Sequence, residues 1–138
     1  MSAIRKLSLP QVKDTNTLRD ALVIMNTSAK EHIAYNATRR GLWSTREEHG
    51  CALVLRRELF NGVEDVAWVR HATGDLHLVY DSDDEDALDM AFGGSFETSI
   101  AQYYAAASAK AQLELEGYGC EVAKLANGEL QVVGTSWA

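Results

Sequence analysis

The sequence predicts an α+β fold, in a single domain that spans residues 1–138. Short runs that alternate apolar and polar residues, separated by Gly-containing turns, are typical of antiparallel strands. Two longer segments place their apolar residues at helical spacing. The predicted order is strand, helix, strand, three-strand meander, helix and hairpin. Its most economical arrangement is ferredoxin-like, with two helices packed on one face of a mostly antiparallel sheet.

The first elements are predicted to be a strand, a helix and a second strand. Residues 4–12 alternate and include Pro10, which strands tolerate near an edge or an end. Residues 15–28 have the apolar spacing of a helix. Residues 31–37 alternate again as a short strand, and the polar stretch 38–50 is predicted to be a loop.

A three-strand meander is predicted in the middle of the chain. Two extended runs, 52–60 and 65–71, flank Asn61-Gly62, a dipeptide typical of tight hairpin turns. A second Gly-containing turn leads into residues 76–81, which are rich in Leu, Val and Tyr.

The last elements are predicted to be a long helix and a closing hairpin. The helix follows a capping Ser95 and ends at Gly117, and the hairpin turns at Asn127-Gly128. One apolar stripe along the helix is expected to face the sheet. Its members are Phe96, Ile100, Tyr104, Ala107 and Ala111.

Composition indicates a packed globular protein, with 46% hydrophobic and 24% charged residues. The first residues hold no apolar run of signal-peptide length, and no window approaches the ~18 apolar residues of a membrane span. We therefore expect a cytoplasmic protein. Cys51 and Cys120 are too few for a disulfide framework and are expected to be reduced thiols.

The stretch Asp81–Asp89 holds six acidic residues in nine positions. It belongs to an uneven charge distribution, in which residues 1–70 carry +3 and residues 71–138 carry −10, for a net charge of −7. Because no lysine or arginine lies between Arg70 and Lys110, we predict a mobile, solvated loop that contacts a basic protein partner. The residues assigned to this contact are Asp81, Asp83, Asp84, Glu85 and Asp86.

Two other interpretations of the acidic stretch stay open at this point. An EF-hand loop is excluded, because it requires glycine at its sixth and glutamate at its twelfth position, where this sequence has Asp86 and Phe92. A looser divalent-metal site on Asp81, Asp83 and Glu85 is one alternative. The other is an acidic face that imitates the phosphates of nucleic acid.

A basic cluster with an aromatic residue precedes the meander. Its members are Arg39, Arg40, Trp43 and Arg46. Tryptophan and arginine are typical of hot spots in protein interfaces, and they also stack on nucleic acid. With a net charge of −7, we favour a protein partner for this cluster.

The histidines, cysteines and glycines indicate no further chemistry. His49 lies two positions from Cys51, but a cysteine that opens an apolar strand is typically a core residue. His71 and His77 flank one turn and supply two ligands at best, so we expect no zinc site. Residues 93–95 lack the Walker lysine and are interpreted as a hinge and helix cap.

The C-terminal two thirds resemble a known family. The segments DVAWVR, LHLVYD and NGELQVV, with the long helix between them, resemble domain-of-unknown-function family twelve hundred and fifty-seven. Its plastid members are called hypothetical chloroplast frame thirty-five, and similar proteins occur in cyanobacteria, other bacteria and phages. The similarity covers roughly residues 50–133 and supports architecture more than activity. The helix positions that carry it are Ile100, Gln102, Tyr103, Tyr104 and Ala105.

These observations together predict a non-catalytic accessory or adaptor protein that binds another protein. The family resemblance implies an AAA-type ATPase as partner, because members are often encoded beside one. The alternatives are a phage-type inhibitor with an acidic, nucleic-acid-mimicking face, acting in the host cytoplasm, and a small metal-dependent enzyme that uses the acidic stretch. We expect no cofactor and no catalytic residue, and the oligomeric state stays open.

Overall fold

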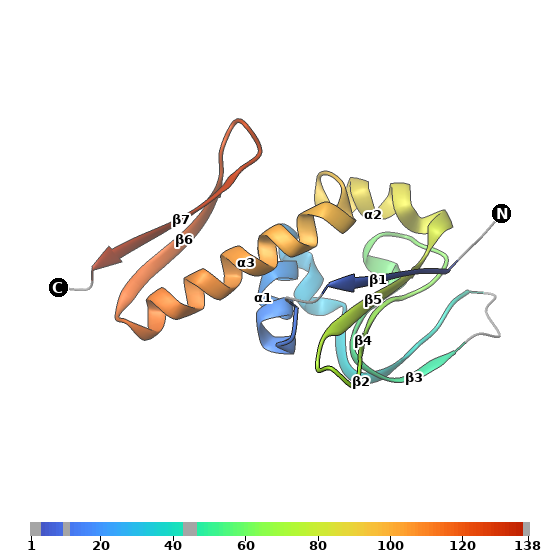
Figure 1. Ribbon diagram of the computed structural model, residues 1–138. Coiled ribbons are helices and arrows are strands. Elements are labelled where there is room, and N and C mark those ends of the chain that lie inside the picture. Colours follow the sequence, from blue (N-terminus) through green and yellow to red (C-terminus); the bar gives the residue numbers. More distant parts are fainter. Residues whose placement is uncertain (1–3, 10–11, 43–46, 137–138) are drawn as a thin grey trace.

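The computed structural model describes residues 4–9, 12–42 and 47–136 and confirms the α+β class (Figure 1). In chain order the elements are β1 (Ile4–Leu9), α1 (Thr15–Met25), η1 (Thr27–Glu31), β2 (Ile33–Arg39), β3 (Glu48–Leu55), η2 (Arg57–Leu59), β4 (Val66–Arg70), β5 (Leu76–Asp81), η3 (Ser82–Asp84), α2 (Glu85–Phe92), α3 (Phe96–Leu115), β6 (Tyr118–Lys124) and β7 (Leu130–Ser136).

Within the described residues, five strands form one sheet in the order β1-β5-β4-β3-β2. Every neighbouring pair in it is antiparallel. Strands β2 to β5 follow one another as a meander, and β1 joins the sheet beside β5. The ferredoxin-like arrangement is not confirmed, because it requires split β-α-β units with parallel neighbouring strands, and α2 is an additional helix.

The connection between β3 and β4 differs from the predicted tight turn. The two strands do pair, with Leu53 opposite Trp68, but residues 56–65 between them form a longer loop that includes η2. Asn61 has a left-handed backbone with φ of 53°. The dipeptide therefore adopts turn geometry inside a longer connection, whose course is set by the polar contacts described below.

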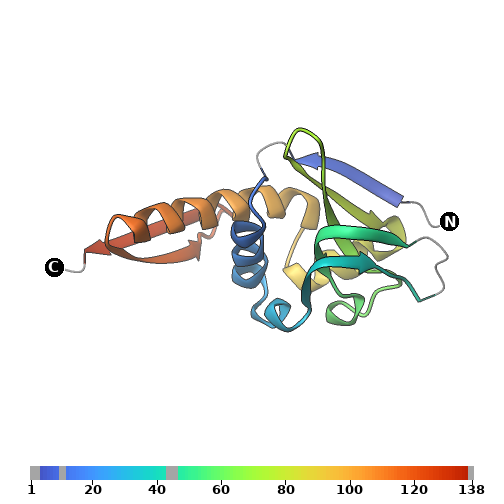
Figure 2. The same ribbon diagram turned by 90° about the horizontal axis from the view of Figure 1, so that it is seen from below.

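The core lies between the sheet and the helices, and α3 contributes to it through its N-terminal part (Figure 2). Trp68 is fully buried and meets Phe96 of α3 with ring centroids 6.2 Å apart, a tilted arrangement that aromatic pairs favour. Leu18 and Leu22 of α1 belong to the same cluster. Asp14 caps α1 by accepting a hydrogen bond from the amide of Thr17, as capping aspartates do.

The predicted stripe of α3 is confirmed only over its first half. Phe96 and Ile100 are buried in the core, and Tyr104 packs against it. Ala107 is buried, with α1 beside it, but Ala111 is exposed, so the prediction for Ala111 is wrong. The reason is length: α3 has 20 residues and its second half extends beyond the sheet (Figure 1).

The second half of α3 carries the β6–β7 hairpin, which was predicted and is confirmed. The hairpin folds back along the helix, and its turn is held where Gln102 Nε2 donates to the carbonyl of Gly128 at 3.2 Å. Residues 108–136, which follow the last buried residue of α3, therefore form a projection from the body of the molecule, here called the arm (Figure 2). Over the described residues, no helix combines the length and apolar character needed to cross a membrane.

Substitutions in α3 are expected to separate its packed half from its projecting half. Ile100→Ala should lower the free energy of unfolding by about 2–5 kcal/mol, because it removes a fully buried side chain from the core. The matched change Ala111→Ser on the exposed half should cost at most about 0.5 kcal/mol. Urea denaturation followed by circular dichroism measures both, and equal losses would contradict this division of α3.

Candidate functional site

The acidic stretch is ordered, and the prediction of a mobile, solvated loop is wrong. It continues from β5 through η3 into α2, and Asp81 and Asp84 are only 3% and 2% exposed. Asp83 and Asp86 are exposed, whereas Glu85 is half-buried. The side chains that were assigned to one partner contact therefore point into different environments.

For Asp84, backbone amides take the place of the cation that sequence reasoning required for burial. Asp84 accepts hydrogen bonds from the amides of Val63 and Glu64 at 2.7 and 3.0 Å. Asp81 accepts from the amide of Asp83 at 2.8 Å, which caps η3. Buried carboxylates that accept several N–H groups need no opposite charge of their own.

The environment of Asp84 raises the pKa of its carboxyl above the ordinary value of 3.8. Desolvation by burial is the main cause, and the negative charges of Asp81 and Glu64 add to it. The two amide hydrogen bonds oppose the shift. Asp84 thus links the start of α2 to the β3–β4 connection, although its ionised carboxylate is disfavoured by burial and by the neighbouring negative charges.

The predicted basic cluster is divided between the interior and the surface. Arg39 is 1% exposed and forms an ion pair with Glu64 at 2.5 Å, so it is not available to a partner. Arg40 is exposed. Trp43 and Arg46 lie outside the described residues. The assignment of Arg39 to a partner surface is therefore wrong, because a buried carboxylate on the neighbouring connection holds it inside.

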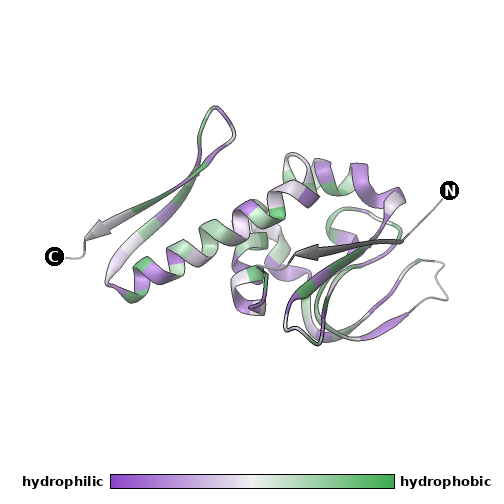
Figure 3. Ribbon diagram, viewed as in Figure 1, coloured by the Kyte–Doolittle hydropathy of each residue, from purple (hydrophilic) through white to green (hydrophobic). Residues whose placement is uncertain are grey.

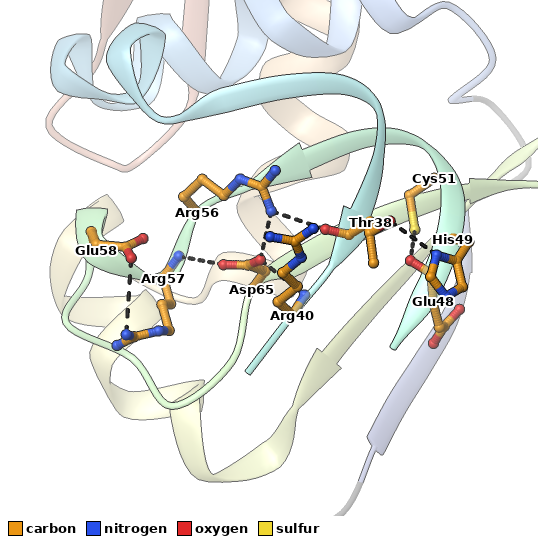
Figure 4. A network of polar contacts seen from close by, with 9 residues as sticks. All are labelled: Thr38, Arg40, Glu48, His49, Cys51, Arg56, Arg57, Glu58 and Asp65. Carbon is orange, nitrogen blue, oxygen red and sulfur yellow. Dashed lines mark hydrogen bonds and ion pairs between the residues drawn. The ribbon is translucent and has the colours of Figure 1, made fainter. Parts of the chain in front are cut away.

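Asp65 organises the surface around Arg40. Its carboxylate is 3% exposed and accepts from the backbone amides of Arg40 and Arg57, at 3.0 and 2.9 Å. It also accepts from Nη1 of Arg56 at 2.9 Å, and the same nitrogen donates to the carbonyl of Thr38 at 2.9 Å (Figure 4). One buried charge thus fixes β2 and both ends of the β3–β4 connection.

A polar depression lies over this network and is here called the arginine pocket. Arg56 and Arg57 belong to it although the sequence assigned them to a strand, because an Arg-Arg pair in an apolar run does not reveal that η2 follows. Glu58 is exposed at its rim and lies 3.9 Å from the Arg57 guanidinium. The lining consists of Arg40, Gly41, Arg56, Arg57, Glu58 and Asp65. Figure 4 labels all of these residues except Gly41.

The remaining candidate residues form no metal or nucleophile site in the described part of the chain. No group of three or more His, Cys, Asp or Glu side chains there is arranged to hold a metal ion. His71 and His77 stack with centroids 3.5 Å apart, which confirms that they oppose each other. Cys51 is buried, and burial raises the pKa of its thiol, which disfavours a thiolate. Ser95 caps α3 as predicted.

Comparison of the chain with family models, curated proteins and solved structures found no match. The family resemblance drawn from the sequence stays a prediction. The candidate site is therefore defined by its own geometry: an arginine pocket outside, and a network of buried carboxylates beneath it.

The variant Asp84→Asn is expected to lower the free energy of unfolding at neutral pH by about 1–3 kcal/mol. An asparagine oxygen can accept from one of the amides of Val63 and Glu64, but its NH₂ group faces the other. The exposed neighbour offers a matched control, and Asp83→Asn should change stability by less than about 0.5 kcal/mol. Equal effects in urea denaturation would contradict the role of Asp84.

The stability difference between wild type and Asp84→Asn is also expected to depend on pH. Because the folded-state pKa is raised, the native protein binds more protons than the unfolded chain between 3.8 and that raised pKa. The protonated Asp84 side chain contributes fully to the free energy of unfolding below pH 3.8. This contribution is lost as the pH rises through the folded-state pKa. A difference that stays constant from about pH 3 to about pH 7 would show that Asp84 titrates normally.

Proposed function

We propose that this protein is a non-catalytic adaptor that binds another protein through its arm. The observation that carries the proposal is the exposure of large apolar side chains on the arm. Leu115 is 83% exposed and Val133 is 46% exposed, and Tyr118 and Leu125 are also exposed. Figure 3 shows apolar residues on β6 and β7 as well as on the main sheet.

The architecture of the arm supports an interface. A two-stranded hairpin gains stability when a further element covers its apolar residues. Here the inner face of the hairpin packs on α3, where Gly134 lies close to Leu113. The outer face, which includes Val133, is open to solvent. Large exposed apolar side chains on a projecting element, here on α3, in the hairpin turn and on both strands, suit contact with a protein partner.

Charge favours a basic protein partner over a second copy of this chain. Residues 108–136 carry two lysines and four glutamates, a net charge of −2, so two copies of this surface would repel each other weakly. A partner with a basic rim around an apolar centre fits better. An AAA-type ATPase, suggested by the family resemblance, is the first candidate to test.

The two alternative functions gain less support. Imitation of nucleic acid needs many carboxylates on one surface, but Asp81 and Asp84 are buried. A metal-dependent enzyme that uses Asp81, Asp83 and Glu85 needs these carboxylates to converge. In the described residues they do not form a metal-binding group.

Replacement of apolar arm residues is expected to abolish partner binding without unfolding the protein. The double variant Leu115→Ser, Val133→Ser should lose binding to a purified AAA-type ATPase that binds the wild type, measured by surface plasmon resonance. Met90→Ser is the matched control, since Met90 is 86% exposed on α2 and lies outside the arm. The control should bind like wild type.

Two results would contradict the proposal. One is capture of the same proteins from native lysate, in the same yield, by wild type and by the double arm variant. The other is a wild-type dimer in light scattering that the arm substitutions dissociate, because the arm would then serve self-association.

A further inference from the structure

We propose that the arginine pocket binds a single phosphate group, as a phosphate monoester or inorganic phosphate. This inference is independent of the proposed arm interface. It depends on three arginine residues that line one depression within the described residues. It also depends on the buried carboxylate of Asp65, which holds the Arg56 guanidinium and the backbone amides of Arg40 and Arg57.

Arg56 supplies a fixed donor. Its Nη1 atom is held by two acceptors, the carboxylate of Asp65 and the carbonyl of Thr38, both at 2.9 Å. Because a guanidinium is planar and rigid, these two bonds also orient its remaining N–H groups. The Arg56 side chain is about one third exposed, which leaves part of it accessible from the pocket. Because the Arg56 guanidinium is already fixed before a ligand binds, it loses little conformational entropy on binding.

The guanidinium groups of Arg40 and Arg57 make fewer or weaker contacts than that of Arg56. The backbone amide of Arg40 donates a hydrogen bond to Asp65, but the Arg40 guanidinium has no acceptor among the described residues. Arg57 donates weakly to the carbonyl of Gly62 at 3.4 Å and lies 3.9 Å from Glu58, which is 60% exposed. An exposed ion pair of this length contributes little stability, so a ligand can replace it.

The charges of the pocket match a phosphate dianion. Three arginines and Asp65 together carry a net charge of +2, and Glu58 can turn away into solvent. A phosphate monoester carries close to two negative charges at neutral pH and presents three acceptor oxygens to guanidinium groups. A single carboxylate would leave one positive charge uncompensated. Extended nucleic acid is disfavoured by the net charge of −7.

Arg40→Gln is the direct test, because the Arg40 guanidinium makes no hydrogen bond or ion pair with the described residues that the substitution would remove. Isothermal titration at constant ionic strength should show saturable binding of inorganic phosphate by wild type, weakened about tenfold in Arg40→Gln. The matched control is Arg19→Gln, which removes the same charge from the surface of α1, where Arg19 forms an ion pair with its neighbour Asp20. The control should bind phosphate as wild type does.

The same titration with different probes identifies the source of the phosphate. Phosphoserine, adenosine monophosphate and inorganic phosphate are each compared with acetate and with a single-stranded oligonucleotide. Tighter binding of any of the three phosphate probes than of acetate supports the proposal. Absence of saturable phosphate binding, equal weakening by Arg40→Gln and Arg19→Gln, or preference for acetate or the oligonucleotide would overturn it.

Discussion

Two buried carboxylates, Asp65 and Asp84, determine how the β3–β4 connection lies on the molecule. Between them they accept four backbone amides, from Arg40, Arg57, Val63 and Glu64, in a part of the chain that has no regular strand pairing of its own. An unpaired amide in such a buried segment would cost about 1–3 kcal/mol. The carboxylates remove this cost, and in doing so they place β2, the connection and α2 against one another.

This constraint links the fold to the candidate site. Because Asp65 is saturated by hydrogen bonds beneath the surface, the arginines around it are positioned without being fully neutralised. The main core is apolar packing around Trp68. The arm belongs to neither region, since α3 leaves the core after Ala107. The molecule thus presents a polar pocket and an apolar projection as separate surfaces.

The sequence predicts the elements well and their polar connections poorly. Alternation and helical spacing depend on local chemistry, so the strands, α1, α3 and the closing hairpin follow from the sequence. The acidic stretch was misjudged because its burial depends on amides from Val63 and Glu64, about twenty positions away. Neither the inward position of Arg39 nor the pocket around Arg56 could be predicted, since both require the folded course of residues 56–65.

Native-state hydrogen exchange tests the role of the buried carboxylates most directly. The account predicts that the amides of Arg40, Arg57, Val63 and Glu64 exchange only through global unfolding, with the same denaturant dependence as the amide of Leu53 in the sheet. Exchange of these four amides at rates close to those of an unfolded chain, while Leu53 stays protected, would contradict it.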